Sequence, residues 1–421
     1  MVTNSFYQKT NNFIDKINNE SIKKSIVLFA LSIIIIVINI FIHKMIIFNY
    51  KSFGFEIYTL ALTWFTILGI PIFLGSRLLF LKINQDRKLL WSSFIVFMFL
   101  GLLFSILLGS VLKIYFIKTL DLKYLSFISN GIILFLFSNV AVKYLSFYLN
   151  AIKKPIISKI FEGLFPILMI VSCLFFLPYY NLFFLYGFAY FVSVFIGLLY
   201  VIIKNKESIS WIIIKSSINR KIIYENFSLG FSEAIFLAAS KISLLFIAYI
   251  SHDLKDMAMF NIALSLSSLS LLIVTSINIV YGPELRNDIK NNNLDNLRDN
   301  FRFIKIVCIC FSVLFLILLL VIGQFFIEYF YTSNYLKAYD LLIILLIGQV
   351  GHSFFGPVGL IANLSGHHNY TAFLKLVSVL FMLLFIFLTY NNLGVFSAAI
   401  AYALSLFIWN ILTYNKIKYL I

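Results

Sequence analysis

One apolar stretch of the chain carries two side chains that could do chemistry in apolar surroundings. It runs from Asn226 to Ile250 and contains Lys241 deep inside it and Glu233 nearer its start. A charge at the centre of a bilayer costs roughly 2.5–3.5 kcal/mol, so such a residue normally faces a cavity or a charged partner. The nine residues after Lys241 are too many for its side chain to reach the interface. Lys241 is therefore predicted either to line a cavity, where its ammonium could hold an anion, or to form a structural ion pair.

Glu233 is a candidate for binding a proton or another ion. It lies eight residues before Lys241, about 80° round a helix and ~12 Å along it, so the two residues cannot pair directly. Burial favours the protonated form of a carboxyl group, which is the property that ion coupling requires. The alternative is a solvated carboxylate at the mouth of the helix.

Three more charged residues, Arg77, Lys143 and Glu162, lie a turn or two inside the ends of apolar segments. Long basic side chains in such places usually reach the interface, and this is one interpretation of Arg77 and Lys143. If the two side chains point inward instead, their positive charges could hold an anion inside the protein. Glu162 is a second candidate for ion coupling.

A polar stripe is expected on the segment after residue 257. Asn261, Ser265, Ser268 and Ser276 recur there at roughly helical spacing. Small polar residues on one face of a membrane helix either allow close helix packing or line a cavity, and packing is the commoner role. Elsewhere, His367 and His368 have no further His or Cys nearby in the sequence, so no metal site is predicted.

The composition excludes an ordinary soluble domain. Of 421 residues, 62% are hydrophobic and 12% charged, and the mean hydropathy is +0.99, whereas a soluble domain is nearer 45–50% apolar and about a quarter charged. A membrane span needs about 20 mostly apolar residues. By that measure the sequence predicts twelve spans, at residues 25–47, 55–79, 89–111, 125–147, 157–178, 182–203, 226–250, 258–281, 303–323, 340–363, 371–390 and 393–414.

The distribution of Lys and Arg predicts the orientation. An even number of spans puts both termini on one side, and 25 of the 33 basic residues then fall on that side, 7 on the other and Lys241 within a span. Such an excess marks the cytoplasmic side, so both termini are predicted to be cytoplasmic. The net charge of +16 belongs to this topology, which argues against nucleic-acid binding.

The spans divide six plus six around a basic segment. The predicted organisation is a first six-helix bundle at 1–203, a cytoplasmic linker at 204–225 and a second six-helix bundle at 226–421. Internal repeats are common in transporters. Here Glu56–Thr63 resembles Ala258–Ser265 at an offset of 202 residues, and Asn150–Lys154 resembles Asn363–His367 at an offset of 213. The offsets differ, so a repeat of this kind requires insertions.

Six short stretches of the second half have a recognisable pattern. They are Lys241–Ile247, Met257–Ala263, Tyr281–Leu285, Tyr329–Tyr339, Gly356-Pro357 and Gly366-His367. These stretches resemble the polysaccharide transporter family, which includes the O-antigen flippases. The resemblance covers essentially the whole chain in hydropathy and loop length, and in that family a buried charge occurs near the position of Lys241.

The resemblance implies a flippase of the multidrug/oligosaccharidyl-lipid/polysaccharide exporter superfamily, an all-α protein of the bacterial cytoplasmic membrane with two bundles arranged in a V. It further implies transfer of a polyprenyl-diphosphate-linked oligosaccharide from the inner to the outer leaflet. On this reading Lys241, Arg77 and Lys143 are expected to contact the diphosphate, and Glu233 and Glu162 to couple a proton or sodium gradient. Membrane lipids, a polysaccharide polymerase and chain-length machinery are the expected partners, and no cofactor is expected.

Two other interpretations remain open. A multidrug exporter of the same superfamily would favour acidic groups, whereas the deepest charge here is basic. An O-antigen polymerase or membrane glycosyltransferase generally carries a large outer loop or acidic residues at an outer mouth. The longest predicted connections of this chain, 204–225 and Gly282–Arg302, are cytoplasmic instead. We therefore expect a transporter and not an enzyme.

Overall fold

The computed structural model describes residues 20–73, 80, 87–119, 131–176, 182–204, 235 and 238–421. Within these ranges the chain is helical apart from short turns, and it contains no strand. Nine of the helices described there are long and apolar enough to cross a membrane. The protein is therefore a multi-pass membrane protein, as the composition predicts.

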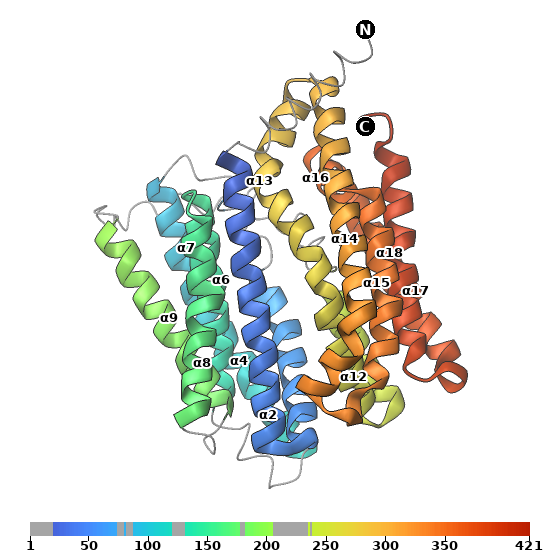
Figure 1. Cartoon of the computed structure of the whole chain (residues 1–421). Helices are drawn as coiled ribbons and strands as arrows, with labels where there is room; N and C mark the ends of the chain where they lie inside the picture. The colour runs from blue at the N-terminus through green and yellow to red at the C-terminus, as the bar shows by residue number, and fades with distance from the viewer. Residues whose placement is uncertain are drawn as a thin grey trace.

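The first described helix, α2 (Glu20–Phe73), contains two of the predicted spans. Lys51 interrupts it with φ 62° and ψ −179°, which is not a helical conformation. The chain turns back there, and Figure 1 shows the second leg returning beside the first. The polar residues Asn49, Lys51 and Ser52 interrupt the apolar sequence at this point, which is why the turn falls there.

The first bundle consists of α2 and the helices that follow it up to Lys204. The strongest contacts within it join α6 to α9 and to α4. Its other elements are α4 (Arg87–Thr119), α6 (Ile132–Ala151), α7 (Pro155–Lys159), the π-helical turn η1 (Ile160–Leu164), α8 (Phe165–Phe176) and α9 (Leu182–Lys204).

The second bundle contains the remaining described helices. Here α18 packs against α15 and α17, and α14 packs against α15. Its elements are the helix Ala238–Ser251, α12 (Leu254–Ser267), η2 (Ser268–Ser270), α13 (Leu271–Lys290), α14 (Leu294–Tyr331), η3 (Ser333–Tyr335), α15 (Lys337–Phe355), α16 (Val358–Leu364), α17 (His368–Leu393) and α18 (Phe396–Ile417). Together with the two legs of α2, this set agrees with about twelve spans in two bundles.

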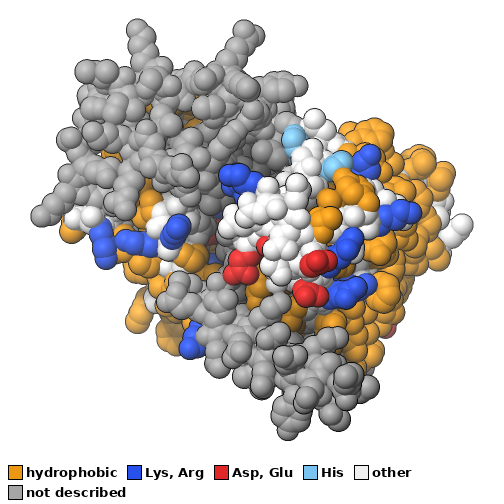
Figure 2. Space-filling model, turned by 90° about the horizontal axis from the view of Figure 1, so that it is seen from above, with side chains coloured by type: hydrophobic (Ala, Val, Ile, Leu, Met, Phe, Trp, Pro, Cys, Tyr) orange, Lys and Arg blue, Asp and Glu red, His pale blue; other side chains and the backbone are white. Residues whose placement is uncertain are grey.

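The two bundles are joined through α2. Among the labelled helices, every extensive contact between the bundles involves α2, which packs against α12, α13 and α14. The start of α2 and the end of α18 lie at the same end of the molecule (Figure 1). Seen from that end, basic side chains are spread over the face and apolar side chains cover the flank (Figure 2). This face is the one that the charge distribution assigns to the cytoplasm.

The predicted connection Gly282–Arg302 is a helical hairpin and not a loop. Helix α13 continues to Lys290 and α14 already begins at Leu294, where the Asn293 side chain accepts a hydrogen bond from the backbone N–H of Asn296. Leu285, Leu297 and Phe301 are buried in this hairpin. Hydropathy misses it because a polar helix outside the membrane needs only one apolar stripe.

The tenth span is shorter than predicted. Helix α15 ends at Phe355, because Gly356 adopts φ +68° and Pro357 follows it. The short helix α16 then continues to Leu364. The eighth span is also interrupted, since η2 separates α12 from α13.

The predicted repeat agrees with the helix boundaries. Helix α7 begins at Pro155 and α17 begins at His368, which is 213 residues later. Helices α9 and α18 end at Lys204 and Ile417, again 213 residues apart. The fifth and sixth spans of the first bundle thus correspond to the eleventh and twelfth spans of the second.

Candidate functional site

A polar pocket of about 340 Å³ lies inside the first bundle. Both legs of α2, together with α6, α7, η1, α8 and α9, contribute to its wall. Its polar lining residues are Asn39, Thr66, Asn139, Lys143, Lys159, Glu162 and Tyr190, and its apolar and glycine lining residues are Ile35, Phe65, Gly69, Leu136, Val140, Gly163 and Ile167.

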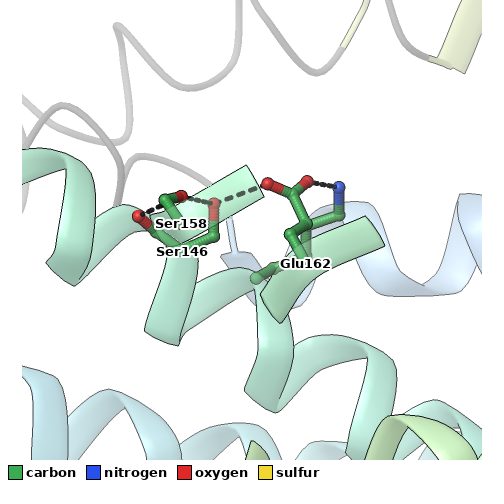
Figure 3. A network of polar contacts seen from close by, with 4 residues as sticks. Ser146, Ser158 and Glu162 are labelled. Atoms are coloured by element: carbon green, nitrogen blue, oxygen red, sulfur yellow. Dashed lines mark hydrogen bonds and ion pairs between the residues drawn. The ribbon is translucent and has the colours of Figure 1, made fainter. Parts of the chain in front are cut away.

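An ion pair between Lys143 and Glu162 forms one side of this pocket. Oε1 of Glu162 accepts a hydrogen bond from the Lys143 ammonium, and Oε2 accepts one from the Ser146 hydroxyl at 2.6 Å. The hydroxyl oxygens of Ser146 and Ser158 are 2.8 Å apart and continue the chain of contacts. Figure 3 shows this network between α6 and the α7–η1 segment. Each carboxylate oxygen therefore has a donor.

Local backbone geometry brings Glu162 to this position. It lies in η1, a single π-helical turn between α7 and α8, and such turns re-aim side chains and are frequent at functional sites. Gly163 follows, and a Cβ there would be 2.6 Å from Cδ1 of Ile35. The missing side chain lets η1 approach the first leg of α2, which places the carboxylate among the polar groups of the bundle.

The pocket has an excess of positive charge. Its described lining contains two ammonium groups, Lys143 and Lys159, and one carboxylate, Glu162. Lys159 is close enough to both other groups to interact with them electrostatically, but among the described residues it forms no hydrogen bond or ion pair. The side chains of Asn39 and Asn139 add amide donors to the same wall. An anion entering the pocket would meet these donors.

Two predicted site residues are brought together here, and two others are not described by the structure. Lys143 and Glu162 are 19 residues apart in sequence and form the ion pair. Arg77 and Glu233, like most of the predicted linker 204–225, lie outside the described residues. The roles of all four in substrate contact or ion coupling stay predictions.

Lys241 is separate from the pocket. It is half-buried in the helix Ala238–Ser251 and is not among the residues that line the polar pocket. It lies within electrostatic range of His43 on the first leg of α2, and it forms no ion pair with any residue that the structure describes. The cavity interpretation of Lys241 therefore concerns the boundary between the bundles.

That boundary is closed at its non-cytoplasmic end by aromatic residues. The Tyr331 hydroxyl is 3.1 Å from Nδ1 of His43, and the His43 ring makes edge contacts with Phe55 and Tyr58. Phe55 also contacts the rings of Tyr331 and Tyr335. Residues of α2 are thus clasped by the end of α14 and by η3, and we refer to His43, Phe55, Tyr331 and Tyr335 as the outer clasp.

The predicted polar stripe is only partly helical. Asn261 and Ser265 are half-buried on α12, and Ser268 begins η2, where its hydroxyl donates to the Ser265 carbonyl at 2.7 Å. Ser270 in the same turn makes the equivalent bond to Ser267 at 2.8 Å. These local bonds satisfy the hydroxyls within their own segment. The fourth predicted residue, Ser276, is buried on α13. None of the four lines the pocket of the first bundle.

The second bundle contains a polar cluster that sequence reasoning missed. Nδ2 of Asn410 donates to Nδ1 of His352 at 2.7 Å and to the Leu406 carbonyl at 2.6 Å. The Lys375 ammonium lies over the Trp409 ring, 5.3 Å from its centroid. The sequence contained one signal for this cluster, because His352, Lys375 and Asn410 are polar residues within apolar segments.

The missed residues of the first pocket had a clearer signal. Lys159 precedes Glu162 by three residues, a spacing that puts two side chains on one face of a helix. Asn39 and Asn139 are isolated amides in apolar runs. Across the described ranges, no group of three or more His, Cys, Asp or Glu residues is arranged to hold a metal ion.

Comparison with known proteins identifies the fold. No family model matches the chain, and no curated protein matches it in sequence. A mutant of the MATE transporter VcmN of Vibrio cholerae matches 95% of this chain and 98% of its own, with a TM-score of 0.69 and 12% identity.

An inward-facing and an outward-facing structure of a multidrug resistance MATE family transporter of the MOP superfamily are also similar to this chain. The inward-facing form covers 94% of this chain and 99% of its own, with a TM-score of 0.68 and 12% identity. The outward-facing form covers 95% of this chain and 96% of its own, with a TM-score of 0.64 and 13% identity. The chain therefore has the two-bundle exporter fold of these MATE transporters.

Proposed function

We propose that the protein is a flippase that moves a polyprenyl-diphosphate-linked oligosaccharide, such as an O-antigen or capsule repeat unit, from the inner to the outer leaflet. The observation that carries this proposal is the excess of positive charge in the pocket of the first bundle, where Lys143 and Lys159 stand against Glu162 alone. A lipid-linked diphosphate brings at least two negative charges into the membrane. Ammonium groups and amide donors in an apolar bundle are suited to hold it.

The fold supports a transport mechanism. Similar chains occur in an inward-facing and an outward-facing form, so a two-bundle architecture of this kind can alternate between them. In this protein α2 connects the bundles, and the outer clasp closes one end of their boundary. Substrate would enter from the cytoplasmic side and leave after the clasp opens.

Lys241 supplies a further positive charge at the boundary between the bundles. It lies within electrostatic range of His43, which belongs to the outer clasp. A diphosphate that leaves the pocket would meet this ammonium before the clasp. We propose that Lys241 holds the phosphates during transfer.

Several parts of the proposal follow the sequence analysis. The energy source is a proton or sodium gradient, with Glu162 and Glu233 as the coupling groups. The protein acts in the bacterial cytoplasmic membrane, together with a polysaccharide polymerase and chain-length machinery. It acts as a transporter and not as an enzyme.

The second candidate is a multidrug exporter, which the structural similarity to a multidrug resistance MATE family transporter favours. A cationic drug would be repelled by the two ammonium groups of the pocket, whereas a diphosphate would be attracted to them. An anionic drug would not be discriminated in this way. Growth in the presence of drugs therefore belongs in the test.

The test is export of surface glycan in a bacterium that lacks its own flippase. The wild-type chain should restore surface glycan, and Lys143→Met and Lys159→Met should each reduce the rate by about tenfold, as expected for loss of one charge-assisted hydrogen bond. Lys204→Ala, an exposed lysine at the end of α9, is the matched control. Unchanged glycan together with increased drug resistance would favour the multidrug exporter instead.

A further inference from the structure

The carboxylate of Glu162 has the surroundings that a bound phosphate would need. It accepts hydrogen bonds from two groups of α6, the ammonium of Lys143 and the hydroxyl of Ser146. A second ammonium, that of Lys159, interacts with it electrostatically. Charge-assisted bonds from ammonium groups and hydroxyls are typical of phosphate sites.

The pair is accessible from the pocket. The Lys143 side chain is 36% exposed and that of Glu162 is 22% exposed, and both line the 340 Å³ space. An anion can therefore approach Lys143 without unpacking the bundle. It would compete with Glu162 for the same ammonium.

We propose that Glu162 is an internal stand-in for the phosphate group, which is displaced when an anion binds to Lys143 and Lys159 and which then takes up one proton from the cytoplasmic solvent. This inference rests on the proposed function, because it assigns a phosphate ligand to the same pocket. It adds a regulatory step, in which anion binding and proton uptake are one linked event.

The proton balance follows from the charges that face Glu162. Lys143 on α6, Lys159 on α7 and Tyr190 on α9 are the titratable groups of the described lining, while α2 contributes the neutral Asn39 and Thr66. Glu162 is the one carboxylate among these lining residues. When it binds a proton, a new O–H bond forms and its negative charge is lost, so it no longer repels the incoming phosphate. For a part-buried carboxyl group without an ammonium partner, the protonated neutral form is favoured over the charged form.

The exchange also predicts how substitutions act on affinity. Glu162→Gln releases the Lys143 ammonium from its ion pair, removes the electrostatic attraction of Glu162 for Lys159, and retains an amide that can hydrogen-bond to Ser146. Its affinity for a phosphate should increase several-fold, because no internal carboxylate competes. Lys143→Met should reduce affinity by about tenfold. If the ion pair were purely structural, both variants would instead bind phosphate more weakly.

The experiment is calorimetric titration of the purified full-length protein with inorganic pyrophosphate, in two buffers of different ionisation enthalpy at one pH. The difference in observed enthalpy gives the number of protons taken up. Wild type should take up close to one proton more than Glu162→Gln, since protonation of the ligand itself is common to both. Glu328→Gln, an exposed carboxylate on α14, should behave as wild type.

Equal proton uptake in wild type and Glu162→Gln would overturn the inference, as would the absence of pyrophosphate binding in wild type. A thermal melt of each variant identifies any that fails to fold, and Glu162→Asp then replaces Glu162→Gln, with weakened pairing and higher affinity expected. The export assay reads the proposed function separately. Normal export without proton-linked binding refutes only this inference, and linked binding without export refutes only the proposed function.

Discussion

Tyr335 donates a hydrogen bond to Oε1 of Glu56 over 3.2 Å, and so joins η3 of the second bundle to the second leg of α2. The same hydroxyl lies 3.3 Å from the carbonyl of Ser52. Burial, together with the nearby Glu56 carboxylate, raises the pKa of the Tyr335 phenol well above its usual range. The group therefore stays protonated at physiological pH and remains a donor.

Tyr335→Phe should loosen the outer clasp. The ring keeps its contact with Phe55, and only the hydrogen bond is lost, which contributes about 1 kcal/mol and corresponds to about a fivefold change in an equilibrium. Distance measurements between spin labels across the outer end should show a larger outward-open population. Tyr339→Phe is the matched control, because the Tyr339 hydroxyl bonds to Leu320 within the second bundle. Equal shifts in both variants would argue against a clasp.

Lys143→Met should destabilise the first bundle by about 1–2 kcal/mol, less than the 3–5 kcal/mol of a fully buried pair, because solvent screens the exposed part of the lysine. The reason is that the Glu162 carboxyl group loses its ammonium partner. Thermal unfolding in detergent measures the effect. In the double variant Lys143→Met/Glu162→Met the loss should be smaller than the sum of the two single losses. If the two losses of stability were strictly additive, the interaction between Lys143 and Glu162 would contribute nothing to stability.

Gly131→Ala should be strongly destabilising. A Cβ at Gly131 would be 2.2 Å from the backbone nitrogen of Phe184 and 2.4 Å from the carbonyl carbon of Phe183. Backbone atoms cannot rotate away, so α6 and α9 must separate, at a cost of about 1–3 kcal/mol or more.

Gly282→Ala is the control for that substitution, because nothing lies within 4 Å of its added Cβ. Within the helix α13, alanine should be neutral or stabilising by up to about 1 kcal/mol. The melting temperatures of the two variants should therefore move in different directions. A loss of similar size in both would show that the α6–α9 approach is not the cause.

Lys241→Ala should abolish export of surface glycan while the protein remains in the membrane at its normal level. The physical reason is the loss of the ammonium near His43 of the outer clasp. Quantitative immunoblotting of membranes and staining of surface glycan measure the two properties. Lys255→Ala, on an exposed lysine of α12, should leave export unchanged. Normal export by Lys241→Ala would remove this residue from the mechanism.

Hydropathy predicts the helices well because membrane spans need long apolar segments. Hydropathy fails where the presence or the end of a helix depends on another property of the sequence. The α13–α14 hairpin is held by the buried side chains Leu285, Leu297 and Phe301, and a polar helix of this kind has no hydropathy peak. The end of α15 depends on Gly356 and Pro357, which hydropathy does not weigh.

The sequence predicts two residues of the candidate site, Lys143 and Glu162, but not their contact. Lys143 and Glu162 stand out as charges in apolar segments, yet their contact joins α6 to the α7–η1 segment across a turn. Their pairing depends on how the two helices cross and on the π-helical turn. The spacing of the sequence alone contains neither. Lys159 is missed because it lies near a predicted interface, where a solvated lysine is the ordinary case.

The tight turn at Lys51 has a mechanical consequence. The legs of α2 meet there without a loop, so a joint tilt of both legs would pivot about this end, where the contacts of the outer clasp lie. Across a hydrocarbon thickness of about 30 Å, a tilt of about 10° at that end moves the far end by about 5 Å. A small displacement at His43 or Glu56 would thus be amplified into a wide change at the cytoplasmic opening.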